Sequence, residues 1–146
     1  MKRVWTRFRA DQDGAVLVEF TLILIPFLLV SIGLVELGRF AWNRESLSDI
    51  ALRAARCMAV ELPACGGMGG FNASATEEMI RSEARQRWID PAALSVSLDR
   101  DASCGGVAGF SRVEITYDYR AQFSLPEIVN ALDRQIEVSS CFPNQD

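Results

Sequence analysis

The stretch 15–35, AVLVEFTLILIPFLLVSIGLV, decides the fold because Glu19 is its only ionisable residue. A helix rises about 1.5 Å per residue, so this stretch would be about 31 Å long, close to the roughly 30 Å of a bilayer's hydrocarbon core. We therefore expect a transmembrane helix over residues 15–42. Pro26 lies in its interior and cannot donate a backbone hydrogen bond, which predicts a kink there.

The whole chain has 146 residues, of which 49% are hydrophobic and 23% are charged, with a formal net charge of −4. This composition argues against disorder, and the negative charge argues against nucleic-acid binding, which normally needs a basic surface. The sequence has no histidine, which excludes Ser-His-Asp triads and histidine metal ligands. Since no catalytic constellation is visible, we expect a protein that is not an enzyme and that needs no cofactor or metal.

Helical periodicity continues beyond the apolar stretch. Apolar residues recur at three- and four-residue spacing, which places them on one helix face: Leu47, Ile50, Ala51, Ala54 and Met58. We therefore expect one helix from about residue 15 to residue 60, apolar in its first half and amphipathic in its second.

A second helix is expected at about residues 75–89, after a glycine-rich loop. Ser74 and Glu77 fit a capping box, in which each side chain satisfies a backbone donor of the first turn. Asp90-Pro91 would end the helix, because a residue before proline avoids helical angles. The predicted apolar face of this helix comprises Ile80, Ala84 and Trp88.

Three segments alternate apolar and polar residues, as strands do: 94–98, 112–120 and about 135–141. The glycine-rich loop CGGVAG would join the first two, and a short helix that starts at Ser124 would join the last two. The predicted fold class is α+β, with a long N-terminal transmembrane and amphipathic helix, a second helix and a small three-stranded antiparallel sheet.

The junction at Gly14 is the most specific feature of the sequence. Residues 1–14 hold four basic residues and two acidic ones, the apolar stretch starts immediately afterwards, and Glu19 lies five residues beyond Gly14. An ordinary secretory signal is cut after its apolar core. A cut at Gly14 would lie before the core, so the apolar helix would stay on the mature protein.

This junction resembles the class III signal of type IV pilin-like proteins, in which a membrane peptidase cuts after the glycine. The resemblance implies cleavage between Gly14 and Ala15, and it makes Glu19 the characteristic glutamate at position five of the mature protein. Further segments are similar to TadE-like minor pilins of the tight-adherence (Tad) pilus system, over about residues 8–60: Val18-Glu19-Phe20, Pro26, Glu36-x-Gly38-Arg39 and Ala54-Ala55-Arg56.

The resemblance implies a pilin-like layout in three parts. Residues 1–14 would be a cytoplasmic prepilin leader, residues 15–42 an inner-membrane helix, and residues 43–146 a periplasmic α+β domain. The expected function is that of a minor pilin or pseudopilin in assembly of a Tad-type adhesive pilus, and the protein would either enter the pilus or stay in the membrane. The expected partners are a prepilin peptidase, other pilins, pilus-assembly membrane proteins and membrane lipid. The alternative is an uncleaved single-pass anchor with a periplasmic domain that scaffolds or binds a partner.

Glu19 needs a partner if it is charged within the bilayer, where a carboxylate costs about 2.5–3.5 kcal/mol. Cleavage would supply the Ala15 ammonium, either in the same chain at helical spacing or in a neighbouring subunit. The alternative is a glutamate that reaches the cytoplasmic interface and pairs with nothing.

Glu36, Gly38 and Arg39 form a motif near the far membrane interface. Glu36 and Arg39 are three residues apart and can pair on one helix face. We interpret the motif as a local ion pair that marks the membrane exit, with recognition of another pilin as the alternative.

The four cysteines are an even number in a domain expected outside the cytoplasm, where disulfides persist. Three pairings can be drawn. We predict Cys57–Cys65, which would turn the chain back at the end of the long helix, and Cys104–Cys141, which an antiparallel order of the last two strands would bring to one edge. A four-cysteine zinc site is the alternative, although the sequence lacks the usual closely spaced cysteine pair.

Overall fold

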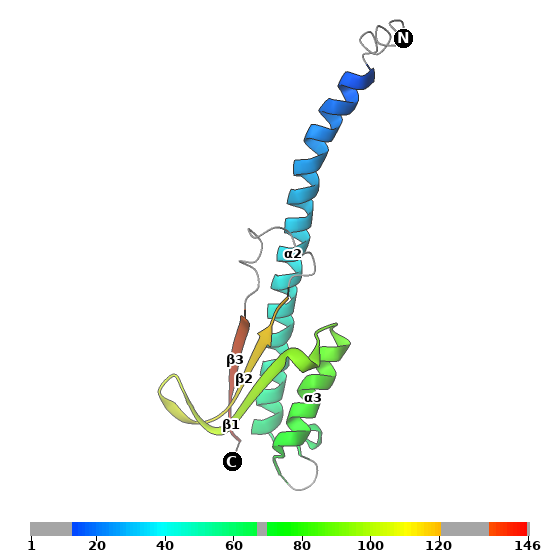
Figure 1. Ribbon diagram of the computed structural model, residues 1–146. Coiled ribbons are helices and arrows are strands. Elements are labelled where there is room, and N and C mark those ends of the chain that lie inside the picture. Colours follow the sequence, from blue (N-terminus) through cyan, green and yellow to red (C-terminus); the bar gives the residue numbers. More distant parts are fainter. Residues whose placement is uncertain (1–12, 67–69, 121–134, 146) are drawn as a thin grey trace, which may run out of the picture. The chain divides into compact units, whose positions relative to one another are not determined.

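The computed structural model describes residues 13–66, 70–120 and 135–145 (Figure 1). The chain divides into two structural units, Met1–Gly38 and Arg39–Asp146. The elements are those of an α+β fold, as predicted: a long apolar N-terminal helix, a second helix and a three-stranded antiparallel sheet.

Helix α2 extends over Asp13–Ala59 and continues through Pro26, close to the predicted 15–60. Most large apolar side chains of its first part point outward, from 48% exposed at Leu28 to 71% exposed at Leu22. Of the described helices, α2 is the one that is long and apolar enough to cross a membrane.

Two hydroxyl groups in the apolar part of α2 find partners within the helix itself. Thr21 Oγ1 donates to the Val18 carbonyl at 2.9 Å, and Ser31 Oγ donates to the Phe27 carbonyl at 2.8 Å. Since an unpaired polar group is costly in hydrocarbon, these bonds make both side chains compatible with an apolar environment.

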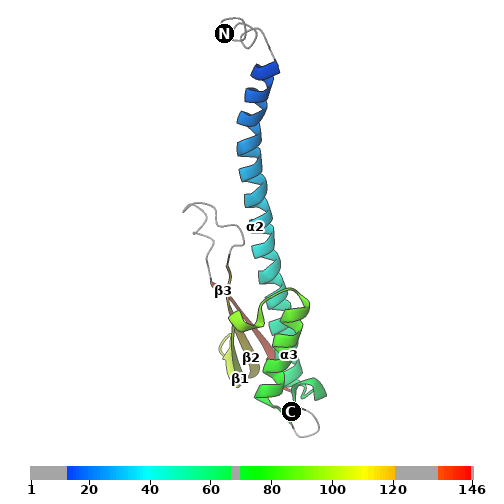
Figure 2. The same cartoon turned by 45° about the vertical axis from the view of Figure 1, so that its right-hand side comes forward.

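The C-terminal half of α2 carries the core of the unit Arg39–Asp146. Helix α3 (Ala73–Gln86) and the sheet both lie alongside this half of α2 in the two views (Figures 1 and 2). The amphipathic face predicted from the sequence is confirmed, because its residues are completely buried: Leu47, Ile50, Ala51, Ala54 and Met58. The same core holds Ile80 and Ala84 of α3.

The N-terminus of α3 differs from the predicted capping box. Asn72 is the N-cap, and its side-chain oxygen accepts hydrogen bonds from the backbone N–H groups of Ser74 and Ala75. Asn72 holds this position because its short side chain reaches back onto the first turn, whereas Ser74 already lies within the helix. Glu77 pairs with Arg81 at 2.6 Å.

The C-terminus of α3 lies at Gln86, before the predicted stop at Asp90-Pro91. Trp88 adopts a left-handed conformation with φ 63°, and the Ile89 N–H donates to the Ala84 carbonyl at 3.0 Å. This pattern is a Schellman motif, which ends a helix through its backbone. The chain reversal puts Ile89 into the core and leaves Trp88 97% exposed, so the prediction that Trp88 shares the buried face is wrong.

The sheet has the order β1-β2-β3, formed by β1 (Leu94–Cys104), β2 (Val107–Asp118) and β3 (Gln135–Pro143). Both neighbouring pairs are antiparallel, as predicted. Cross-strand rows of apolar residues form the face toward the core: Leu94, Tyr117 and Ile136 in one row, and Val96, Ile115 and Val138 in the next.

The connection between β1 and β2 is shorter than the predicted CGGVAG loop. Cys104 pairs with Val107, so only Gly105 and Gly106 form the turn, with φ 62° and 85°. Positive φ at both turn positions is what a two-residue hairpin needs, and glycine adopts it without strain. The helix predicted from Ser124 lies outside the described residues, and two short 3-10 helices, Pro63–Cys65 and Pro91–Ala93, complete the elements.

Asn72→Ala should lower the unfolding free energy of the protein in detergent by about 1 kcal/mol, because two N–H groups of the first turn lose their acceptor. For a domain of about 100 residues this corresponds to a fall in Tm of about 4–8 °C. Ser74→Ala is the matched control and should change Tm much less. A larger fall for Ser74→Ala than for Asn72→Ala would restore the capping box and contradict the assignment of Asn72.

Candidate functional site

The amino-terminal junction lies in the first turns of α2. Gly14 is the second residue of the helix. The space beside it is free, since an added Cβ would meet no described atom within 4 Å. Glu19 is exposed and lies four residues after Ala15. Residues four apart in a helix occupy the same face, so Glu19 lies one turn from the predicted new N-terminus. The cleavage itself and the pairing of Glu19 stay predictions.

In the motif at the end of the apolar part, Glu36 and Arg39 both have interaction partners, and Gly38 has free space beside it. The Glu36 side chain is only 1% exposed, and it takes part in an interaction, as does Arg39. An added Cβ at Gly38 would meet no atom within 4 Å, so nothing in the described chain requires glycine there. A carboxylate as buried as Glu36 is typical of a structural interaction. Whether Glu36 and Arg39 pair with each other stays a prediction.

Arg87 forms an ionic contact between α3 and α2 that sequence reasoning missed. Its guanidinium donates to the Asp49 carboxylate at 2.6 Å and to the Ser46 carbonyl at 3.4 Å. Arg53, one turn further along α2, also contacts Asp49 at 3.3 Å. The hydrogen bond from Arg87 is the main cause that lowers the pKa of Asp49 below its ordinary value. In the sequence, Asp49 is simply one residue of the polar face of α2.

A shallow cleft of about 370 Å³ opens between the 3-10 helix Pro91–Ala93 and the end of β2. Its lining combines acidic, basic and phenolic groups: Asp90, Ala92, Ala93, Tyr117, Asp118 and Arg120. Burial raises the pKa of Tyr117, and the negative charge of Asp90 acts in the same direction. Sequence reasoning missed this cleft because its residues come from segments that are far apart along the chain.

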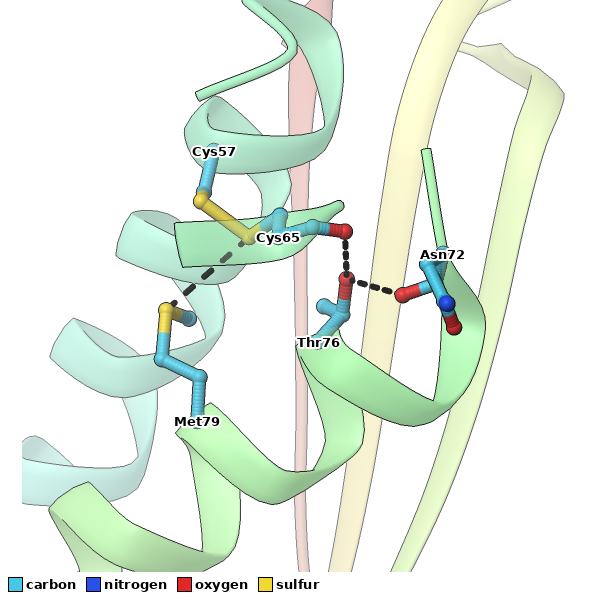
Figure 3. The surroundings of a disulfide bond; sticks show 5 residues. All are labelled: Cys57, Cys65, Asn72, Thr76 and Met79. Atoms are coloured by element: carbon cyan, nitrogen blue, oxygen red, sulfur yellow. Dashed lines mark hydrogen bonds between the residues drawn. A yellow bond between two sulfur atoms is a disulfide. The ribbon is translucent and has the colours of Figure 1, made fainter. Parts of the chain in front are cut away.

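The disulfide Cys57–Cys65 is present as predicted and ties the end of α2 to the loop that precedes α3 (Figure 3). Its surroundings hold it in place: the Cys65 carbonyl accepts hydrogen bonds from the Asn72 N–H at 3.0 Å and from Thr76 Oγ1 at 3.3 Å. Met79 Sδ lies 3.9 Å from Cys65 Sγ. Because Thr76 is completely buried, this bridge belongs to the core of the unit and not to its surface.

Gly66 follows the bridge and is needed there for a steric reason. A Cβ at this position would lie 1.8 Å from the Gly70 carbonyl oxygen. No side chain fits such a close approach of two backbone segments. The glycine-rich loop therefore has a packing role next to Cys65.

The second disulfide, Cys104–Cys141, is also present as predicted, with a Cα–Cα distance of 6.6 Å. Cys141 pairs in register with Arg112 of β2, whereas Cys104 is the last residue of β1 before the turn. Irregularities in the β1–β2 register on either side of Ala102 interrupt the regular pairing near the hairpin end. Such bulges bend strands, which accounts for a bridge between two strands that are not neighbours in the sheet.

The four cysteines are all used in these two bonds. Within residues 13–66, 70–120 and 135–145, no group of three or more Cys, Asp or Glu side chains is placed to hold a metal ion. The thiolates that a zinc site would need are therefore already committed to sulfur–sulfur bonds.

Residues 14–56 match the sequence model of the family described as TadE-like protein. The match begins at Gly14, contains Glu19 and the Glu36-x-Gly38-Arg39 motif, and ends three residues before α2 does. The resemblance to TadE-like proteins is thereby confirmed for this segment, and it connects the chain with Tad pilus systems. No curated protein and no solved structure matches the chain.

Replacing Cys104 and Cys141 together by serine should lower the unfolding free energy by about 3–4 kcal/mol in the chain-entropy model. The matched pair Cys57→Ser/Cys65→Ser should cost about 2–3 kcal/mol in that model, because its cysteines are 8 residues apart and not 37. Denaturant unfolding in detergent measures both. Peptide mapping without reductant provides the direct check, and a peptide that links Cys57 or Cys65 to Cys104 or Cys141 would contradict the strand order.

Proposed function

We propose that this protein is a minor pilin, or pseudopilin, that takes part in assembly of a Tad-type pilus after a prepilin peptidase removes residues 1–14. The observation that carries the proposal is the family match that begins at Gly14. A basic segment precedes this glycine and an exposed apolar helix follows it, so the boundary of the match coincides with the boundary of the physical change in the chain.

The exposed apolar part of α2 supports a role in which the helix moves from lipid into contact with the helices of other pilins. The exposed large apolar side chains between Val16 and Leu37 need an apolar environment. Lipid tails and the apolar side chains of other pilin helices cover such a surface about equally well, because no hydrophobic driving force separates them. The helix could therefore wait in the inner membrane and later pack against other subunits.

The spacing of Ala15 and Glu19 supports a specific step in this transfer. Cleavage after Gly14 would convert the Ala15 amide into an ammonium one helical turn from Glu19. An unpaired carboxylate near the bilayer interior is costly, so the two charges stabilise each other within one chain or across two subunits. A precursor that keeps residues 1–14 has no ammonium at this place, which would make assembly depend on processing.

The disulfides support a periplasmic placement of residues 43–146. Disulfides persist in oxidising compartments and are rare in the cytoplasm. With the leader on the cytoplasmic side, α2 would then cross the inner membrane once. In this function the chain acts through binding, without an enzymatic activity or a cofactor.

One observation favours the alternative of an uncleaved membrane anchor. Helix α2 begins at Asp13, so the Gly14–Ala15 peptide bond is helical in the described structure. A peptidase would have to unwind this first turn, although the first turn is the part of a helix whose N–H groups lack internal partners. The identity of the N-terminal residue in the membrane-bound protein distinguishes a processed pilin from an uncleaved anchor.

Gly14→Val should leave the full-length precursor in the membrane, because a branched side chain would obstruct a peptidase that needs a small residue before the cut. Gly33→Val is the matched control, since it makes the same change in the apolar part of α2 away from the junction, where an added Cβ meets nothing within 4 Å. Mass spectrometry of the membrane-bound protein reads the result. Normal removal of residues 1–14 from the Gly14→Val variant would defeat the proposal.

Glu19→Ala should insert and be processed like the wild type, because it makes the helix more apolar and leaves Gly14 unchanged. The number of assembled pili should fall. If the ion pair stabilises the assembled subunit by about 1.4 kcal/mol, its loss lowers the equilibrium constant for assembly about tenfold. Glu45→Ala is the control, as it removes an exposed carboxylate from α2 beyond the apolar stretch. Pilus number and surface recovery equal to wild type in Glu19→Ala cells would show that the pairing is not needed.

A further inference from the structure

Trp88 is not explained by the folding of the chain. It occupies a left-handed position directly after α3, with φ 63°, where glycine is the usual residue and a bulky side chain is strained. Its side chain is 97% exposed, so the core gains nothing from it, and the neighbouring Ile89 provides the buried contact of this turn. A large aromatic residue in a strained and fully exposed place points to a contact outside the chain.

The cleft of about 370 Å³ begins two residues beyond Trp88, at Asp90. Trp88 is not among its lining residues, so the indole lies beside the cleft and does not fill it. The lining includes two small apolar side chains, Ala92 and Ala93, and the half-buried ring of Tyr117. A cavity of about 150 Å³ can hold a benzene ring, so this cleft has room for an indole. The unit Arg39–Asp146 therefore carries an exposed aromatic side chain and, next to it, an open cleft of suitable size.

The polar groups of the cleft match those of an indole. One oxygen of the Asp90 carboxylate accepts from the Ala92 N–H at 2.9 Å. One oxygen of the Asp118 carboxylate accepts from Gln135 Nε2 at 3.0 Å. The second oxygen of each carboxylate is left as an acceptor for an outside donor, and the indole N–H is such a donor. Arg120 lines the same cleft, and a guanidinium is attracted to the face of an indole ring.

The charge beside Trp88 is complementary to the charge of the cleft. Arg85 lies three residues before Trp88, is exposed, and has no ion-pair partner within the described part of the chain. The cleft carries two negative charges, on Asp90 and Asp118, against the one positive charge of Arg120. A second chain that brings its indole and its Arg85 to the cleft would therefore meet a net negative charge, and complementary charges orient such contacts.

We propose that Trp88 of one chain inserts into this cleft on a second copy, whose own Trp88 inserts into the cleft of the first. Because the indole and the cleft are adjacent on one surface, a two-fold axis can bring each against its counterpart, as in isologous dimers. The contact involves only residues of the unit Arg39–Asp146. It goes beyond the proposed function, because it depends neither on cleavage at Gly14 nor on pilus assembly.

The area of this contact indicates a weak and reversible dimer. An aromatic side chain buries about 150–250 Å², so two indoles and the cleft surfaces that they cover amount to about 600–1,000 Å². Specific interfaces usually bury about 1,200–2,000 Å². Anchoring of both chains in one membrane would raise their effective concentration and favour the contact. The dimer is therefore best detected with both chains in one bilayer.

The first test replaces Trp88 by the photoreactive amino acid p-benzoylphenylalanine in the full chain, in phosphatidylcholine vesicles that contain no other protein. Illumination should link two chains, and mass spectrometry should place the link between position 88 of one chain and residues 90–93 or 117–120 of the other. A mixture of isotopically light and heavy chains identifies links between copies. Absence of such links, links to lipid alone, linked species larger than two chains, or links that form only after another pilin is added would overturn the proposal.

The matched control places the same photoreactive amino acid at Val107, which is 60% exposed at the β1–β2 turn. This position lies outside the proposed contact, so it should yield no link to residues 90–93 or 117–120 of a second copy. Equal yields of these links from positions 107 and 88 would reveal random collision and would overturn the proposal.

A second test uses one chain that lacks the indole and another whose cleft is filled. Trp88→Gly should leave Tm unchanged or higher, because glycine adopts positive φ without strain. Ala92→Trp fills the cleft from an exposed position, so the core is not altered. Energy transfer between donor- and acceptor-labelled chains in vesicles measures the dimer. Each variant alone should dissociate at least about tenfold more readily than the wild type, as expected when a central aromatic contact is lost.

A mixture of the two variants distinguishes insertion of Trp88 from a folding defect. The Trp88→Gly chain keeps its cleft and the Ala92→Trp chain keeps its indole, so one of the two contacts can form between them. Energy transfer between the two variants should therefore exceed that within either variant alone. Energy transfer in the mixture that is no higher than in the separate variants, or a Trp88→Gly chain that dimerises like the wild type, would contradict the reciprocal contact.

Discussion

The domain depends on the close contact between the C-terminal half of α2 and the elements around it. The buried face of this half is rich in alanine, with Ala51, Ala54 and Ala55 completely inaccessible. Since alanine has no atoms beyond Cβ, neighbouring elements can approach the helix closely there, and larger residues would overpack the contact. Leu47 and Met58 fill the two ends of the same face. The first disulfide and the Arg87–Asp49 pair then fix the two ends of α3 against α2.

The same helix is apolar and exposed before this contact begins. The apolar stretch and the buried face both belong to helix α2, Asp13–Ala59. Apart from the donor that Pro26 lacks, the backbone groups inside such a stretch are paired within the helix, so it can lie in lipid or against other helices. In the proposed transfer from membrane to pilus, the apolar stretch of α2 can stay helical throughout.

Much of this architecture could be predicted from the sequence, because it is encoded in local periodicity. The face from Leu47 to Met58 and the alternation of Val113, Ile115 and Tyr117 need only the helix and strand periods. The Cys104–Cys141 bridge followed from an antiparallel strand order. The missed features depend on backbone conformation or distant contacts. Asn72 replaced Ser74 as the cap, the left-handed backbone at Trp88 moved a predicted core residue to the surface, and Arg87 found Asp49 across two helices.

The central claim is that the chain carries a leader that ends at Gly14 and an apolar helix that remains after the leader is removed. The most direct test is the N-terminal residue of the wild-type protein isolated from membranes, read by mass spectrometry of the intact chain and its N-terminal peptide. The account predicts Ala15, free or methylated, in the mature protein. A chain that still begins with Met1 in cells whose peptidase processes other prepilins would contradict it.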